Sequence, residues 1–311
     1  MLHILGLLGL RQGEEEPSEG KEIEGKTGSF VHFEEEYLKC LKVTPSSGTE
    51  DWRACIAVRA ARRRLGVDKI DSGLGGLKIQ PVYNLPLRFT LARGAALGIP
   101  ADIDSAWCEA QVSAVNAFWA QAGIKFVFAG AVEVNFESTT PMAATAASAR
   151  ETIWAFRRDQ DRRTQREMRR IVFLNELIPY HGSTSDCYDI HLFDFIGQTF
   201  QGCCIDRESH SIIMGVRSNK GYAQVTRRPD ACLAKTMAHE LGHALQLNHP
   251  RGQQWPDGSG YVLDAEGMGR ENLDNIMVGG ADRRGGGGRG LEEWQIMISR
   301  MSARHFLKIR S

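Results

Sequence analysis

The most constraining feature of this chain is a group of histidines near residue 240. His239-Glu240-Leu241-Gly242-His243 is followed, six residues after His243, by His249. Positions four apart on an α-helix lie one turn above each other, so the spacing predicts that His239 and His243 share one helix face. Neutral imidazole nitrogens are borderline-soft donors, which suit Zn²⁺ better than Mg²⁺ or Ca²⁺. The sequence therefore predicts a zinc site on a helix.

The helix that carries this pair is predicted to run from Ala231 to Leu247. Asp230 is expected to be its N-cap, because an aspartate there accepts hydrogen bonds from the first free backbone N–H groups. Apolar residues recur at helical spacing, and we expect them to pack beneath the site as core. They are Leu233, Met237, Leu241, Ala244 and Leu245.

His249 requires the helix to end. At about 100° per residue, six further residues would place it on the far side of a continued helix. The chain must therefore fold back for His249 to reach the same ion. Asn248 and Pro250 flank it and support such a stop, since asparagine tolerates a left-handed conformation and proline cannot continue a helix.

These residues together resemble the HExxHxxGxxH zinc signature of the metzincin metallopeptidases. The resemblance implies that His239, His243 and His249 bind zinc and that Glu240 is the general base. One position differs, because Gln246 stands where the family has glycine. A side chain costs about 1 kcal/mol in the left-handed turn that this glycine adopts, and Asn248 could take over part of that turn.

A second stretch resembles the Met-turn of the same family. It is Asp274-Asn275-Ile276-Met277-Val278-Gly279-Gly280, in which Met277 matches the family's methionine. The rival interpretation of the zinc site takes its third ligand from Glu266 or Glu271. Gly267 and Gly269 interrupt the helix that such a glutamate would need, so His249 is the favoured ligand.

The resemblance implies an α+β fold: a metzincin-like zinc peptidase domain with a twisted, mixed five-stranded sheet, an active-site helix and a C-terminal helix. It also implies a zinc-dependent endopeptidase that acts on a peptide or protein substrate. Structural zinc sites normally have four protein ligands, and three histidines leave a position for water. Glu240 would take a proton from that water. The alternative is a catalytically silent zinc-binding pseudoenzyme that acts as a peptide- or protein-binding module.

The chain is expected to divide at Gly73-Leu74-Gly75-Gly76. Residues 1–76 would form a partly disordered N-terminal extension, and residues 77–311 the catalytic domain. In some metzincins a propeptide cysteine blocks the zinc, so Cys40 or Cys55 is either such a blocking ligand or a structural or free thiol. Sequence patterns predict helices over Trp52–Leu65, Ile103–Ala122, Ala146–Arg170 and Leu291–Leu307, and strands over Val82–Leu91, Ile124–Val134, Asp189–Ile196 and Ser211–Val216.

The segment Thr199–Ile205, between the last two of these strands, would by the resemblance be an edge strand above the substrate cleft. An extended peptide can add itself to such an edge through main-chain hydrogen bonds. Gly202, Cys203 and Cys204 are therefore weak candidates for substrate binding. Equally, either cysteine could be buried or bonded to Cys187.

Composition limits the other classes of function. The formal net charge is +0, which argues against nucleic-acid binding, and no apolar run is long enough to span a membrane. The arginine-rich stretch from Arg157 to Arg170 is either a patch for acidic ligands or a solvated helix face. Leu2–Leu10 is too short for a convincing signal peptide, so localisation stays open, although the resemblance favours a secreted or extracytoplasmic protein. The 7 cysteines cannot all pair within the chain.

Overall fold

The computed structural model describes residues 30–46, 50–66, 79, 81–94, 98–135, 186–194, 202–207, 210–218, 226–249, 275–277 and 290–309. The chain forms two compact units. One contains the chain up to Tyr83 together with Trp119–Lys125 and Leu247–Ser311, and the other contains Asn84–Phe118 and Phe126–Gln246. The predicted boundary at Gly73–Gly76 and the expected helix over Ala146–Arg170 lie outside the described residues.

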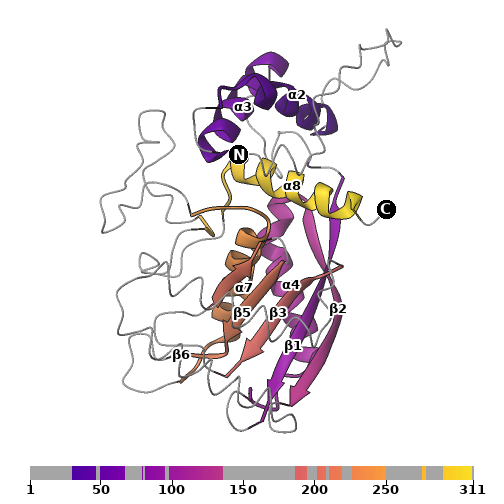
Figure 1. The fold of residues 1–311 in the computed structure, drawn as a ribbon, viewed down its shortest axis with the longest axis vertical. Coiled ribbons are helices and arrows are strands. Elements are labelled where there is room, and N and C mark those ends of the chain that lie inside the picture. Colours follow the sequence, from indigo (N-terminus) through magenta and orange to yellow (C-terminus); the bar gives the residue numbers. More distant parts are fainter. Residues whose placement is uncertain are drawn as a thin grey trace, which may run out of the picture. The chain divides into compact units, whose positions relative to one another are not determined.

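The second unit is built on a mixed sheet. Its strands are β1 (Tyr83–Arg93), β2 (Ile124–Asn135), β3 (Tyr188–Phe193), β4 (Gly202–Asp206) and β5 (Ser211–Gly215), in the order β2-β1-β3-β5-β4. β3 runs parallel to both β1 and β5, whereas β4 is antiparallel to β5 at the sheet edge. Figure 1 shows β1 and β2 running in the same direction. A separate short pair joins β6 (Arg217–Ser218) to β7 (Thr226–Arg227).

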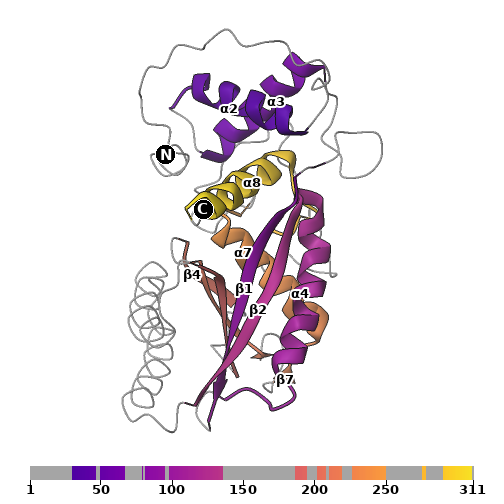
Figure 2. The ribbon, with the colours of Figure 1, turned by 90° about the vertical axis from the view of Figure 1, so that its right-hand side faces the viewer.

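Two helices cover one face of this sheet. They are α4 (Ser105–Trp119) and α7 (Asp230–Ala244), and Figure 2 shows both on the same side. Alternate residues of β1 are fully buried, as expected for a strand that lies against a core: Leu85, Leu87, Phe89 and Leu91. Helices packed on a mixed sheet agree with the general α+β expectation, while the metzincin fold itself stays a prediction.

Side-chain hydrogen bonds fix α4 at its start and against β2. Asp104 Oδ1 accepts the Trp107 N–H at 2.9 Å, as an N-cap does. Asn116 both donates to the Phe126 carbonyl at 2.8 Å and accepts the Phe126 N–H at 2.7 Å. The predicted helix over Ile103–Ala122 is divided in the structure. α4 ends at Trp119, and the residues after it form the 3₁₀ turn η1 (Ala120–Ala122).

The first unit is helical. It contains α2 (Phe30–Val43), α3 (Glu50–Leu65), η1 and α8 (Glu293–Lys308). α2 packs on α3, and α8 packs on both α3 and η1. Phe30, Phe33 and Tyr37 of α2 are at most 1% exposed, so this helix contributes large apolar side chains to the core. The sequence patterns predict α3 and α8 but not α2.

A buried ion pair lies at the centre of this helical unit. Arg300 of α8 and Glu34 of α2 are 0% and 2% exposed, and the guanidinium Nε donates to Glu34 Oε1 at 2.5 Å. Its other nitrogens donate to the carbonyls of Ala122 at 2.9 Å and Pro81 at 3.1 Å. The guanidinium also lies over two aromatic rings, those of Phe30 and Tyr83. Arg300 therefore joins four separate segments of the chain.

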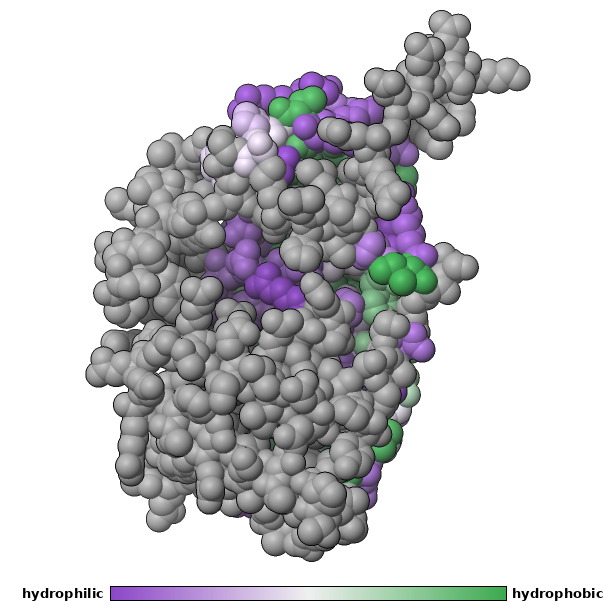
Figure 3. All heavy atoms as spheres, in the orientation of Figure 1, coloured by the Kyte–Doolittle hydropathy of each residue, from purple (hydrophilic) through white to green (hydrophobic). Residues whose placement is uncertain are grey.

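On the face drawn in Figure 3, hydrophilic described side chains gather near the centre, and hydrophobic ones form separate spots near the top and along one side. Single exposed apolar side chains are common on soluble domains and mark no interface by themselves. The large ones are Val31, Val43, Val82, Val127, Val132 and Ile309. No helix among the described residues is long and apolar enough to cross a membrane.

Candidate metal centre

The helix α7 positions the first two histidines. It begins with Asp230 as its first residue, and Pro229 is the N-cap, so the predicted capping by Asp230 is wrong by one position. Leu233, Met237 and Leu241 are 0% exposed, and the helix contacts β3, β4 and β5. This buried face fixes the rotation of the helix, and the rings of His239 and His243 lie 4.8 Å apart between centroids.

The end of α7 differs from the prediction. The helix ends at Ala244 rather than Leu247. Gln246 has a φ of 71°, and its N–H donates to the His243 carbonyl at 3.0 Å. Gln246 thus adopts the left-handed conformation itself, and Asn248 does not take it over. Leu245 and Leu247 are 0% exposed although they lie beyond the helix, which explains why their apolar spacing suggested a longer one.

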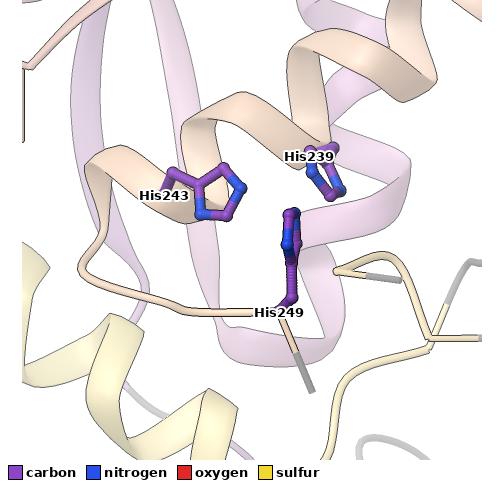
Figure 4. Close-up of side chains that lie close together, drawn as sticks. All are labelled: His239, His243 and His249. Atoms are coloured by element: carbon purple, nitrogen blue, oxygen red, sulfur yellow. The ribbon is translucent and has the colours of Figure 1, made fainter. Parts of the chain in front are cut away.

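The turn brings His249 back to the helix. One ring nitrogen each from His239, His243 and His249 lie within 4.8 Å of one another. Figure 4 shows the three rings directed toward a common space, two from α7 and one from the following loop. This confirms the predicted grouping, and three imidazoles are a donor set that fits zinc. Glu266 and Glu271 lie outside the described residues.

Glu240 lies beside the edge strand. Its side chain is buried, and Oε2 accepts the Cys204 N–H of β4 at 2.8 Å. A Cβ added to Gly202 would lie 2.8 Å from Thr236 Cγ2 and 2.9 Å from Glu240 Cγ. Glycine at this position is therefore what lets β4 approach α7 so closely. Two of the weak substrate-binding candidates, Gly202 and Cys204, are next to Glu240; the side chain of Cys203 lies outside the description.

Arg228 is a buried residue that no pattern in the sequence singles out. It donates to the Gly215 carbonyl of β5 at 3.1 Å and also to the Thr236 hydroxyl of α7. These bonds connect the end of β5, the strand next to the edge, to the middle of the helix that carries His239 and His243. In the sequence, Arg228 follows another arginine before a helix start, which gives no sign of burial.

Met277 lies in a tight turn and is fully buried. Its N–H donates to Asn275 Oδ1 at 2.9 Å, and Asn275 Nδ2 donates to Gln295 Oε1 of α8 at 2.7 Å. The Ile276 N–H donates to the Gly290 carbonyl at 2.9 Å. The predicted methionine is thus part of a turn held by an asparagine side chain, and the glycines that follow it lie outside the described residues.

A second unpredicted contact involves the residue before His249. Asn248 Nδ2 donates to Asp51 Oδ1 at 3.3 Å, although the two positions are 197 residues apart. Asp51 belongs to α3 and is 1% exposed. No local pattern in the sequence could have identified this pair, because only the fold brings α3 to the loop after α7.

No protein-family model matches this chain, and no curated protein does either. The centre must therefore be interpreted through its own chemistry. Two nitrogen donors and a buried carboxylate lie on a helix packed against an antiparallel edge strand, and a third nitrogen donor lies on the loop that follows. Such a set can hold a divalent ion with at least one position left for another ligand.

Proposed function

We propose that this protein is a zinc-dependent endopeptidase of the metzincin type. The observation that carries the proposal is the convergence of the three histidines, with Glu240 following His239 directly on the same helix. Structural zinc sites are normally closed by four protein ligands, and the group found among the described residues has three. This donor set therefore favours a catalytic site over a structural one.

The chemistry divides between the ion and the chain. A zinc ion bound by three imidazoles lowers the pKa of water toward about 7 and polarises a carbonyl oxygen. Glu240 accepts the proton of the water that attacks the peptide carbonyl carbon, and it then delivers that proton to the leaving amine as the C–N bond breaks. The hydrogen bond from the Cys204 N–H holds one carboxylate oxygen in place, which restricts the side chain to one orientation.

The sheet edge offers a place for the substrate. β4 is the terminal strand of the sheet, and its Gly202–Cys204 segment lies next to Glu240. An extended peptide can pair with an edge strand through main-chain hydrogen bonds, with little dependence on its sequence. We infer that the substrate is an extended peptide or an extended segment of a protein.

The test compares Glu240→Gln with His243→Ala in the cleavage of a mixed peptide library. The glutamine variant should retain zinc and lose hydrolysis, because it keeps the shape of the side chain but cannot take up a proton. The alanine variant should lose both zinc and hydrolysis. The parent activity should disappear with a chelator and return with added zinc, and hydrolysis retained by Glu240→Gln would contradict the proposed role of Glu240.

The same experiment separates the alternative function. A parent protein that binds zinc and gains thermal stability, yet cleaves no peptide, would support a zinc-containing module that binds peptides without hydrolysing them. Metal analysis alone does not separate the two functions, so the profile of cleaved peptides is the deciding measurement.

A further inference from the structure

The third histidine lies on a segment with no regular secondary structure. α7 ends at Ala244, Gln246 reverses the chain direction, and residues 247–249 follow without helix or strand. A ligand on such a segment loses more conformational freedom on binding a metal than a ligand on a helix. Contacts that hold the segment in place before metal binding therefore add directly to metal affinity.

The structure shows two such contacts immediately before His249. Leu247 is 0% exposed, so its side chain anchors the segment in the core. Asn248 donates to Asp51 Oδ1 at 3.3 Å. Asp51 is 1% exposed and sits in the first turn of α3, a regular element that packs on both α2 and α8. The partner of Asn248 is thus a rigid one.

We propose that Asp51 is a positioning residue for the metal centre. By holding Asn248, it keeps the adjacent His249 where its ring meets those of His239 and His243. This inference rests on the zinc site of the proposed function and adds that the N-terminal helix α3 belongs to that site. α3 is then required for full metal affinity and is not a segment that must be removed before the site can work.

The test measures the zinc dissociation constant of the full-length chain by competition with a chromophoric chelator. Asp51→Leu and Asn248→Ala should each weaken zinc binding by about 10-fold or more, the usual effect of removing a partner that orients a metal ligand. The double variant should bind zinc no more weakly than the worse single variant, because both changes remove the same hydrogen bond. Asp51→Asn keeps an acceptor oxygen and should stay within about threefold of the parent.

Arg53→Met is the matched control for general damage to α3. Arg53 is a buried residue of the same helix, and it donates to the carbonyls of Leu41 and Thr44 at 3.2 and 3.4 Å. This variant should lower the melting temperature of the metal-free protein and leave the zinc dissociation constant of the folded protein unchanged. Parent-like affinity in Asp51→Leu and Asn248→Ala, additive effects in the double variant, or an equal loss in Arg53→Met would each overturn the proposal.

Zinc affinity also keeps this inference separate from the peptidase proposal. A parent that binds zinc but cleaves no peptide would contradict the peptidase function, and the anchoring role of Asp51 would still be decided by the zinc affinities of the five variants relative to the parent. A parent that binds no zinc would overturn the anchoring role itself.

Discussion

At the scale of single residues, the site depends on a few close approaches. The closest is at Gly202, where the absence of a side chain lets the edge strand meet Thr236 and Glu240 of α7. Any larger residue must displace either the strand or the carboxylate, which makes this glycine a direct test of the described geometry.

Gly202→Ala should destabilise the protein by about 1–3 kcal/mol, the usual cost of adding a methyl group to a packed interior. Hydrolysis should fall further than the loss of folded protein explains, because the added Cβ would lie 2.9 Å from Glu240 Cγ. Urea unfolding and peptide cleavage measure the two effects. The double variant with Thr236→Ser removes the methyl that lies 2.8 Å from the new Cβ, and it should recover part of the stability. Unchanged stability and activity in Gly202→Ala would contradict the close packing.

Two cysteines should differ sharply in reactivity. Burial raises the pKa of Cys108 to about 12, whereas Cys232 at the start of α7 is exposed. Only the thiolate reacts with thiol reagents, so at pH 8 the native protein should be labelled at Cys232 and protected at Cys108. Because the pKa is raised, the stability from burying the neutral thiol is complete below about pH 8.5 and is lost as pH rises toward 12.

Mass spectrometry of the labelled peptides measures the labelling rates of Cys108 and Cys232. Denaturant should make the two thiols react alike, which provides the internal control. Rapid labelling of Cys108 in the native protein would show that α4 does not bury it.

At the scale of elements, the buried pair of Arg300 and Glu34 joins α8 to α2. Arg300→Met leaves the Glu34 carboxylate buried without its cation and deprives the Ala122 and Pro81 carbonyls of their donor. Breaking such a pair from one side costs about 3–5 kcal/mol. Urea unfolding should show this loss, and adding Glu34→Gln should recover part of it because the remaining partner is then uncharged.

Arg62→Met is the matched surface control for this prediction. Arg62 of α3 pairs with Glu293 of α8 at 3.0 Å, and the two side chains are 30% and 21% exposed. A partly exposed ion pair of this kind contributes about 0–1 kcal/mol to the free energy of unfolding. Equal destabilisation by Arg62→Met and Arg300→Met would contradict the structural importance of the buried pair.

Elements with a clear apolar period were predictable, and those that depend on distant partners were not. β1 and α8 lie close to their predicted ranges because apolar residues alternate along the strand and recur at helical spacing along the helix. β5 also lies close to its predicted range, since a short continuous apolar run is typical of a strand buried on both faces. The end of α7 was misplaced because Leu245 and Leu247 are buried outside the helix. Arg300 resembles an ordinary polar position of a helix in the sequence. Only the fold shows that Glu34 and two backbone carbonyls surround it.

At the scale of the whole molecule, metal binding should contribute to stability. His249 lies outside α7, so unfolding separates it from His239 and His243 and removes the site. Zinc at 100 times its dissociation constant should therefore raise the unfolding free energy by about 2.7 kcal/mol. Thermal melts with and without zinc measure the shift, and a chelator should reverse it.

His249→Ala is the control for that shift. With two ring nitrogens left, most of the zinc-dependent rise in melting temperature should disappear. If zinc raises the melting temperature of this variant as much as that of the parent, the ring of His249 is not a ligand. The site would then need a different third donor.

The three histidines illustrate how much of the site could be predicted before the fold was known. Their spacing within the motif predicted the pair on α7, and the need for a chain reversal predicted the place of His249. Asp51 could not be predicted, because a hydrogen bond between positions 197 residues apart leaves no local pattern.

The left-handed backbone of Gln246 has a consequence for how chains of this kind are detected. If glutamine can occupy that turn at a cost of about 1 kcal/mol, then glycine there is a preference rather than a requirement. A search pattern that requires glycine at that position would pass over this chain, whereas a pattern that accepts other residues there would include it.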